Sequence, residues 1–92
     1  AAGRIATLIV CGANPAYADP QAAAALAKVP TILAITERLD ETARLAAAAA
    51  PALHDLETWG DAAPAPGVCA LHQPCIRPLW DARAAEQTLM AW

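Results

Sequence analysis

A short loop with the potential to bind a ligand directly follows the first apolar run of the chain. The loop reads Gly12-Ala13-Asn14-Pro15 and comes after residues 5–11, I-A-T-L-I-V-C. Glycine lets a ligand approach the backbone, asparagine tolerates unusual backbone angles, and proline fixes the turn. The alternative is a plain turn between a strand and a helix. The loop matches neither the glycine-rich dinucleotide fingerprint nor the phosphate-binding loop of nucleotide hydrolases.

A second polar segment, residues 36–42 (T-E-R-L-D-E-T), follows the next apolar run, residues 31–35. If both runs are parallel strands, their carboxyl ends share the sheet edge at which such sheets bind ligands. Polar groups of this segment and of Asn14 could then meet the same ligand. The alternative is a helix start that carries acids in its first turn, where the helix dipole favours them. The residues alone leave both interpretations open.

Side chains suited to nucleophilic or metal chemistry are few. The chain has no serine and only two histidines, which excludes a Ser–His–Asp arrangement. A pair of Cys69 and His72 is compatible by type, but a structural histidine is the favoured interpretation. Cys11, Cys69 and Cys75 lack the paired spacing of a zinc site and the four thiolates of an iron–sulfur cluster. We expect them to be buried free thiols.

The elements that must position the two loops form a βαβ unit. Residues 5–11 and 31–35 are short runs rich in Ile that suit strands buried on both faces of a parallel sheet. Between them, residues 20–28 predict a helix with Asp19 as its N-cap and Pro20 at its first position. The crossover between the two strands should be right-handed.

The Ala-rich segment after the second strand is less clearly patterned. Residues 41–50 predict a helix by propensity, with Asp40 as its cap. Pro51 ends either that helix or a short strand that follows it.

The last third of the chain has weaker signals. Residues 58–67 contain two Gly and two Pro and predict a loop, whereas residues 68–72 predict a strand. Residues 81–92 predict a final helix with Asp81 as its cap. The predicted fold class is α/β, a small Rossmann-like βαβ sheet of about four strands flanked by helices. We expect one domain over residues 1–92, since this length suits a single modest core.

Composition predicts a thin core. The hydrophobic fraction is 58%, but alanine supplies most of the excess and the chain has no Phe. Alanine buries little apolar area, so we expect marginal stability or a surface that a parent protein or partner covers. Trp59 and Trp80 either pack over the sheet or mark a surface that faces neighbouring domains.

Charge and hydropathy exclude several classes of partner. The net charge of −3 and the scattered arginines argue against nucleic acid and against a polybasic membrane patch. No apolar run approaches the roughly 20 residues of a membrane-spanning helix, and residues 5–11 are too short for a signal peptide. The start at Ala1 predicts processing or a piece cut from a longer protein. We expect a soluble domain, in the bacterial cytoplasm or periplasm depending on its parent.

Taken in order, several segments resemble the molybdopterin oxidoreductase family of the dimethyl-sulfoxide-reductase type. The matching landmarks are the apolar run before G-A-N-P-A-Y, the V-P strand, D-E-T-A, a segment that ends in Pro, L-E-x-W-G-D and Q-P-x-I-x-P-L. Within that family, W-G-D after L-E is typical of the molybdopterin-like iron–sulfur subunits of alternative complex III. The resemblance covers nearly the whole chain and depends on the order of the motifs.

The resemblance implies a Rossmann-like domain that holds part of a molybdopterin guanine dinucleotide in the parent protein. The positions that match the cofactor-facing loop and the acidic segment of the family are Gly12, Asn14, Pro15, Asp40, Glu41 and Thr42. The likeness to the alternative complex III subunits implies the opposite, because those subunits do not carry the molybdenum cofactor. The same loops would then serve assembly.

The chain departs from the family in carrying no cysteine cluster motif and no metal-ligating segment. Redox chemistry would therefore belong to other parts of the parent, and we assign no catalytic residue and no bound cofactor to this chain alone. Two functions remain. The first is a cofactor-contributing domain of a molybdopterin-type oxidoreductase or respiratory electron-transfer protein. The second is a non-catalytic structural module of a membrane-associated electron-transfer complex. In both cases the expected partners are the remaining domains or subunits of the parent, with neither nucleic acid nor direct membrane insertion.

Overall fold

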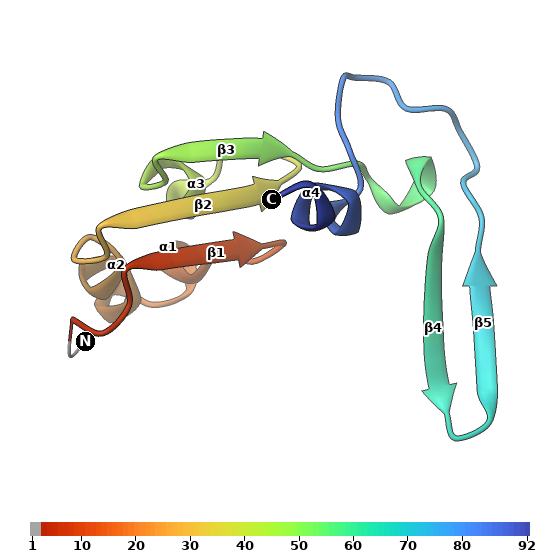
Figure 1. Cartoon of the computed structure of the whole chain (residues 1–92), viewed down its shortest axis with the longest axis horizontal. Helices are drawn as coiled ribbons and strands as arrows, with labels where there is room; N and C mark the ends of the chain where they lie inside the picture. Colours follow the sequence, from red (N-terminus) through yellow and green to blue (C-terminus); the bar gives the residue numbers. More distant parts are fainter. Residues whose placement is uncertain (1–2) are drawn as a thin grey trace.

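The computed structural model describes residues 3–92 and divides into a parallel sheet, a separate hairpin and a C-terminal helix (Figure 1). In chain order the elements are β1 (Thr7–Cys11), α1 (Pro15–Ala18), α2 (Pro20–Leu26), β2 (Thr31–Thr36), α3 (Glu41–Arg44), β3 (Ala48–Pro51), the 3₁₀ helix η1 (Asp55–Glu57), β4 (Gly60–Ala65), β5 (Val68–His72) and α4 (Ala85–Ala91).

The predicted βαβ unit is confirmed, but the expectation that both strands are buried on both faces is wrong for β1, whose residues alternate between exposed and half-buried at the edge of the sheet. Strand β1 pairs in parallel with β2, from Thr7 opposite Thr31 to Cys11 opposite Ile35. Helices α1 and α2 make the connection, and Asp19 caps α2 by accepting a hydrogen bond from the backbone N–H of Gln21 at 2.8 Å. In Figure 1, α1, α2 and α3 lie behind the strands, on one face of the sheet.

The core is centred on β2, the middle strand of the order β1-β2-β3. Ile32, Ala34 and Ile35 on this strand are buried, and Ile35 is only 1% exposed. Leu26 from α2 and Ala43 from α3 complete the buried apolar set near the sheet. These side chains are small or few, so the thin core that the composition predicts is found in this part of the chain.

The predicted helix over 41–50 is wrong beyond its first turn. Helix α3 ends at Arg44, and Ala48–Pro51 forms β3, which pairs in parallel with β2. Alanine has the highest helix propensity, but propensity is a weak preference that tertiary contacts override. Here the hydrogen-bonding edge of β2 offers the segment ladder partners. The alternative of a short strand ended by Pro51 is confirmed, as is Asp40 as the cap of α3.

The described residues form a three-stranded parallel sheet and a two-stranded antiparallel one, so the expected four strands do not lie in one sheet. The predicted strand over 68–72 is β5, but its partner is β4, in a segment for which we predicted a loop. Pro64 lacks an N–H, and the register shifts between Ala62 and Ala65 around it. Gly67 turns the chain with φ of +78°.

The C-terminal helix begins later than expected, and Asp81 does not cap it. Helix α4 starts at Ala85 with Ala84 at the N-cap. Before that, Arg83 forms a parallel bridge with Ala52, and its carbonyl accepts from Leu53 N–H at 3.2 Å. This bridge holds the chain extended just beyond β3, which postpones the helix. Figure 1 shows α4 between the carboxyl end of the sheet and the hairpin.

All three cysteines are free and exposed, so the expectation that they are buried is wrong. Among residues 3–92, none of the helices combines the length and the hydropathy that a membrane-spanning helix needs.

Candidate functional site

A crevice of about 490 Å³ lies at the carboxyl ends of the three parallel strands. This is the edge at which open α/β sheets bind ligands. Its walls come from the loops after β1, β2 and β3 and from the start of α4. The lining residues are Cys11, Gly12, Ala13, Asn14, Ile35, Thr36, Glu37, Arg38, Asp40, Ala52, Leu53, Asp55 and Ala85.

The six positions assigned from the family resemblance divide between this crevice and the structure behind it. Three of them line the crevice: Gly12, Asn14 and Asp40. The other three, Pro15, Glu41 and Thr42, do not line it. The structure nevertheless brings Asn14, Glu41 and Thr42 into direct contact with one another.

Asn14 and Thr42 fasten the loop after β1 to α3. The Thr42 hydroxyl donates to Asn14 Oδ1 at 2.7 Å, and the Thr42 N–H donates to the same oxygen at 3.2 Å. The hydroxyl also accepts from the backbone N–H of Ala16 at 3.0 Å. Thr42 is 1% exposed, so each of its polar groups would be costly to leave without a partner.

Of the two neighbouring carboxylates, Glu41 takes part in this fastening and Asp40 caps α3. Asn14 Nδ2 donates to Glu41 Oε2 at 2.6 Å, and this hydrogen bond is the main reason that the pKa of Glu41 lies below its usual value. Asp40 Oδ1 accepts from the backbone N–H of Ala43 at 2.8 Å and so caps α3. These side chains therefore form hydrogen bonds with one another and with the backbone at the start of α3.

The backbone donors of the first loop are also largely used within the chain. The N–H of Gly12 donates to the carbonyl of Ile35 at 3.0 Å. Those of Tyr17 and Ala18 both donate to the carbonyl of Asn14 at 3.2 Å. Phosphate-binding loops depend on backbone N–H groups that point at the ligand. This loop offers few of them.

The charge of the crevice is unfavourable for an anion. Glu37, Asp40 and Asp55 contribute three carboxylates to its lining, against the single guanidinium of Arg38. A dinucleotide brings a negatively charged pyrophosphate, which these carboxylates would repel. The residues present therefore do not fit the nucleotide part of a molybdopterin guanine dinucleotide.

A second interlock joins two motifs that lie about 20 residues apart in the sequence. The carbonyl of Leu56 accepts from the N–H groups of Cys75 at 2.8 Å and Ile76 at 3.1 Å. Glu57 Oε1 accepts from Leu79 N–H at 2.8 Å, and its Oε2 accepts from His54 N–H at 3.0 Å. These two hydrogen bonds, Leu79 first, lower the pKa of Glu57. The L-E of L-E-x-W-G-D thus holds Q-P-x-I-x-P-L in place.

Both histidines have structural roles, as expected. His54 Nδ1 accepts from Leu56 N–H at 3.1 Å and caps η1. His72 Nε2 donates to the carbonyl of Asp55 at 2.6 Å. Cys69 and His72 are three positions apart on β5, so their side chains point to opposite faces of the hairpin. They do not form a catalytic pair.

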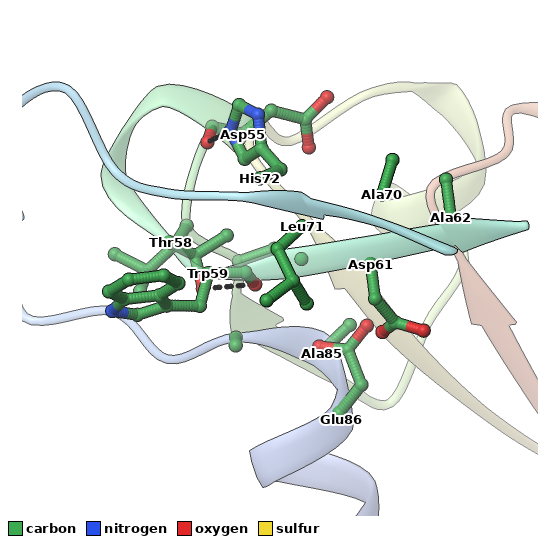
Figure 2. A pocket seen from close by; sticks show the side chains of 14 residues that line it. Asp55, Thr58, Trp59, Asp61, Ala62, Ala70, Leu71, His72, Ala85 and Glu86 are labelled. Carbon is green, nitrogen blue, oxygen red and sulfur yellow. Dashed lines mark hydrogen bonds between the residues drawn. The ribbon is translucent and has the colours of Figure 1, made fainter. Parts of the chain in front are cut away.

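A second groove, of about 560 Å³, lies between the hairpin and α4 (Figure 2). Trp59 and Asp61 of W-G-D line it together with Leu71 from β5 and Glu86 from α4. Trp59 is 65% exposed and Trp80 is 80% exposed, so neither packs over the parallel sheet. Sequence analysis singled out Trp59 but missed Glu86, because only the fold brings α4 beside the hairpin.

Comparison with known proteins finds a relative among respiratory enzyme subunits. The chain is 38% identical, over 91 aligned residues, to the menaquinone reductase, molybdopterin-binding-like subunit of Nitratidesulfovibrio vulgaris. The alignment takes in 91% of this chain and 13% of that protein, so the chain spans about an eighth of the relative's length. No protein-family model matches the chain. The chain is thus similar to one part of an oxidoreductase-related subunit, in agreement with the family resemblance of its motifs.

Proposed function

We propose that this chain is a non-catalytic structural domain of a respiratory oxidoreductase subunit of the molybdopterin-binding-like kind. In this function the Rossmann-like sheet is retained for assembly, and the crevice at its edge does not hold the nucleotide part of a cofactor. The partners are the remaining domains or subunits of the parent protein. The similarity to the menaquinone reductase subunit supports the kind of parent.

The observation that carries the proposal is the fastening of Asn14 to Thr42 and Glu41. A side chain that recognises a ligand needs donors or acceptors that face the ligand. Here the amide of Asn14 uses both its oxygen and its nitrogen within the chain. Two further observations support the proposal: the N–H of Gly12 already donates to the carbonyl of Ile35, and the crevice is lined by carboxylates.

Cofactor binding in the parent protein is the second candidate function. It is favoured by the position of the crevice at the carboxyl ends of the parallel strands, where Gly12, Asn14 and Asp40 line it. Under this alternative, residues from other parts of the parent would have to supply the phosphate contacts that this chain lacks.

Titration of the ¹⁵N-labelled chain with guanosine diphosphate tests the two functions against each other. The structural function predicts no saturable amide shift at Gly12, Ala13 or Thr36 up to millimolar nucleotide, in a well-dispersed spectrum. Saturable shifts confined to the loops after β1 and β2 would overturn it.

A charge-reversed variant, Glu37→Lys, sharpens this titration. Glu37 lines the crevice and is exposed, so the substitution should leave the fold intact. Weak nucleotide binding by the variant alone would identify charge as the barrier. If neither protein binds the nucleotide, charge is not the barrier. The lack of binding is then attributed to the backbone N–H groups of the loop, which are bonded within the chain.

A further inference from the structure

The groove between the hairpin and α4 has a surface that this chain leaves uncovered. Every residue of β4 and β5 is exposed, and Leu71 at the groove is 77% exposed. A two-stranded hairpin is only marginally stable in water by itself. Exposed clusters of large apolar side chains on a folded domain mark surfaces that another polypeptide covers.

The apolar part of the groove has the composition of an interface centre. The indole of Trp59 and the side chains of Leu53 and Leu71 are its large apolar groups. Alanines from the hairpin, from the segment after β3 and from the start of α4 form the rest of the apolar wall. Tryptophan is enriched among the residues that dominate binding energy at interfaces. The small alanines leave room for a side chain from outside.

The polar part of the groove is acidic. Asp55, Asp61 and Glu86 line it, and among the described lining residues there is no Lys or Arg. The one basic group is His72, whose Nε2 is already bonded to the carbonyl of Asp55. Figure 2 shows Asp61 from β4 and Glu86 from α4 pointing into the same part of the groove, beside Leu71. Two carboxylates that share a site are most stable with a cation between them.

We propose that this groove is the docking site for a basic segment of another polypeptide, in which an arginine lies between Asp61 and Glu86 while an aliphatic neighbour covers Leu71 and Trp59. Arginine fits better than lysine because its planar guanidinium offers five donors, enough for two carboxylates at once, and stacks on an indole. The partner is a further domain or subunit of the parent protein. The proposal rests on the structural function above, since it names what such a domain packs against.

This docking gives the W-G-D motif a role that the crevice does not. Trp59 and Asp61 both line the groove, and the glycine between them pairs with His72 at the start of β4. Glu57, in the L-E that precedes the motif, holds the segment after β5 by accepting a hydrogen bond from Leu79 N–H. The motif would then be retained for assembly rather than for chemistry.

The test is NMR titration of the full ¹⁵N-labelled chain with two matched peptides. The first is acetyl-Ala-Leu-Arg-Leu-Ala-amide, and the second carries citrulline in place of arginine, which keeps the shape and removes the charge. We expect the arginine peptide to shift the indole N–H of Trp59 saturably and to bind about ten-fold more tightly than the citrulline peptide. The indole resonance is assigned with Trp59→Phe.

Matched variants locate the contact. The double variant Asp61→Asn/Glu86→Gln should weaken the arginine peptide by about ten-fold or more. Asp81→Asn removes one carboxylate outside the groove and should change the affinity less than about two-fold. Asp61, Glu86 and Asp81 are all exposed, so each variant should fold, and a dispersed spectrum checks this.

Three results would overturn the proposal: equal binding of the two peptides, no saturable shift of Trp59, or an equal loss in Asp81→Asn and the double variant. Spermidine that binds as tightly as the peptide would assign the groove to small polycations instead. These outcomes are independent of the nucleotide titration. A failed peptide titration with no nucleotide binding overturns only the docking site, whereas nucleotide binding overturns the structural function on which the docking site rests.

Discussion

The parallel-sheet half of the chain and the half after β3 differ sharply in how they are held together. In the first half, β2 and its helices bury Ile32, Ala34 and Ile35, and Thr42 satisfies its polar groups inside the fold. After β3, the described residues contribute only Ala84 and Thr88 to the buried set. The hairpin projects away from the sheet with all of its residues exposed (Figure 1).

The difference shows two ways of fixing a shape. The first half depends on apolar burial, the dominant favourable term in folding, together with a few buried hydrogen bonds. The second half depends on exposed hydrogen bonds such as those of Glu57, which water can replace at little cost. The second half therefore needs a partner surface more than the first does.

The largest expected effect tests this contrast directly. Ile35→Ala removes a side chain that is 1% exposed and should lower the free energy of unfolding by about 2–5 kcal/mol. Leu71→Ala, in the hairpin, removes a side chain that is 77% exposed and should change it by less than about 0.5 kcal/mol. Urea unfolding followed by circular dichroism measures both. Similar losses would show that the hairpin is part of the cooperative core.

A buried hydroxyl gives the next effect. Thr42→Val keeps the shape but leaves Ala16 N–H and Asn14 Oδ1 without the hydroxyl, and should cost about 1–3 kcal/mol. The matched control is Thr58→Val in the second half, whose hydroxyl makes a single exposed bond to the carbonyl of Trp59. We expect little change there. The same urea unfolding curves apply, and a Thr42→Val protein as stable as the control would contradict the fastening role.

Helix capping gives a smaller effect. Asp40→Ala removes the acceptor for Ala43 N–H at the start of α3 and should cost about 1 kcal/mol. Asp81→Ala removes the residue that the sequence predicts as the cap of the last helix. Because α4 begins at Ala85 instead, this substitution should be close to neutral. Thermal unfolding of the two variants separates them, and a loss at Asp81 equal to that at Asp40 would mean that the last helix starts earlier.

The contrast between the halves also explains what the sequence could predict. The βαβ unit was predictable because its signals are local: two Ile-rich runs, an N-cap at Asp19 and a proline at the first helical position. Asp40 as a cap followed from the same local logic. The meeting of Asn14 with the segment after β2 followed from the geometry of parallel strands.

What could not be predicted depends on contacts between distant segments. Alanines 46–50 carry no periodic signal, and only the edge of β2 makes part of them a strand. The sequence of β4 predicts a loop because it contains Pro64 and is followed by Pro66. Only the pairing with β5 makes the segment a strand. The hydrogen bonds of Asn14 within the chain could not be predicted either, because an asparagine that binds a ligand and one that binds a helix start look the same in a sequence.

The smallest effect concerns two carboxylates that hold neighbouring segments together, Glu41 in the first half and Glu57 in the second. Glu41 and Glu57 both have pKa values lowered from 4.5, the first mainly by Asn14 and the second mainly by Leu79 N–H. A carboxyl group with a depressed folded pKa adds stability that is complete above its unfolded pKa and is lost as pH falls through the folded value. Both interlocks should therefore hold at neutral pH and loosen only below pH 4.5.

An NMR titration in acid compares the two interlocks. The Leu79 amide reports on Glu57, and the side-chain amide of Asn14 reports on Glu41. Each should titrate with a midpoint below 4.5, and Glu57→Gln should abolish the shift of Leu79 while leaving that of Asn14 intact.

We expect protonation of Glu57 to move the amide of Ile76 as well, because no buried side chain holds that segment. Protonation of Glu41 should stay local, since Thr42 still binds Asn14 through two other hydrogen bonds. Midpoints at or above 4.5 would contradict the charged hydrogen bonds in both halves, and a disturbance that spreads equally from both would remove the distinction between them.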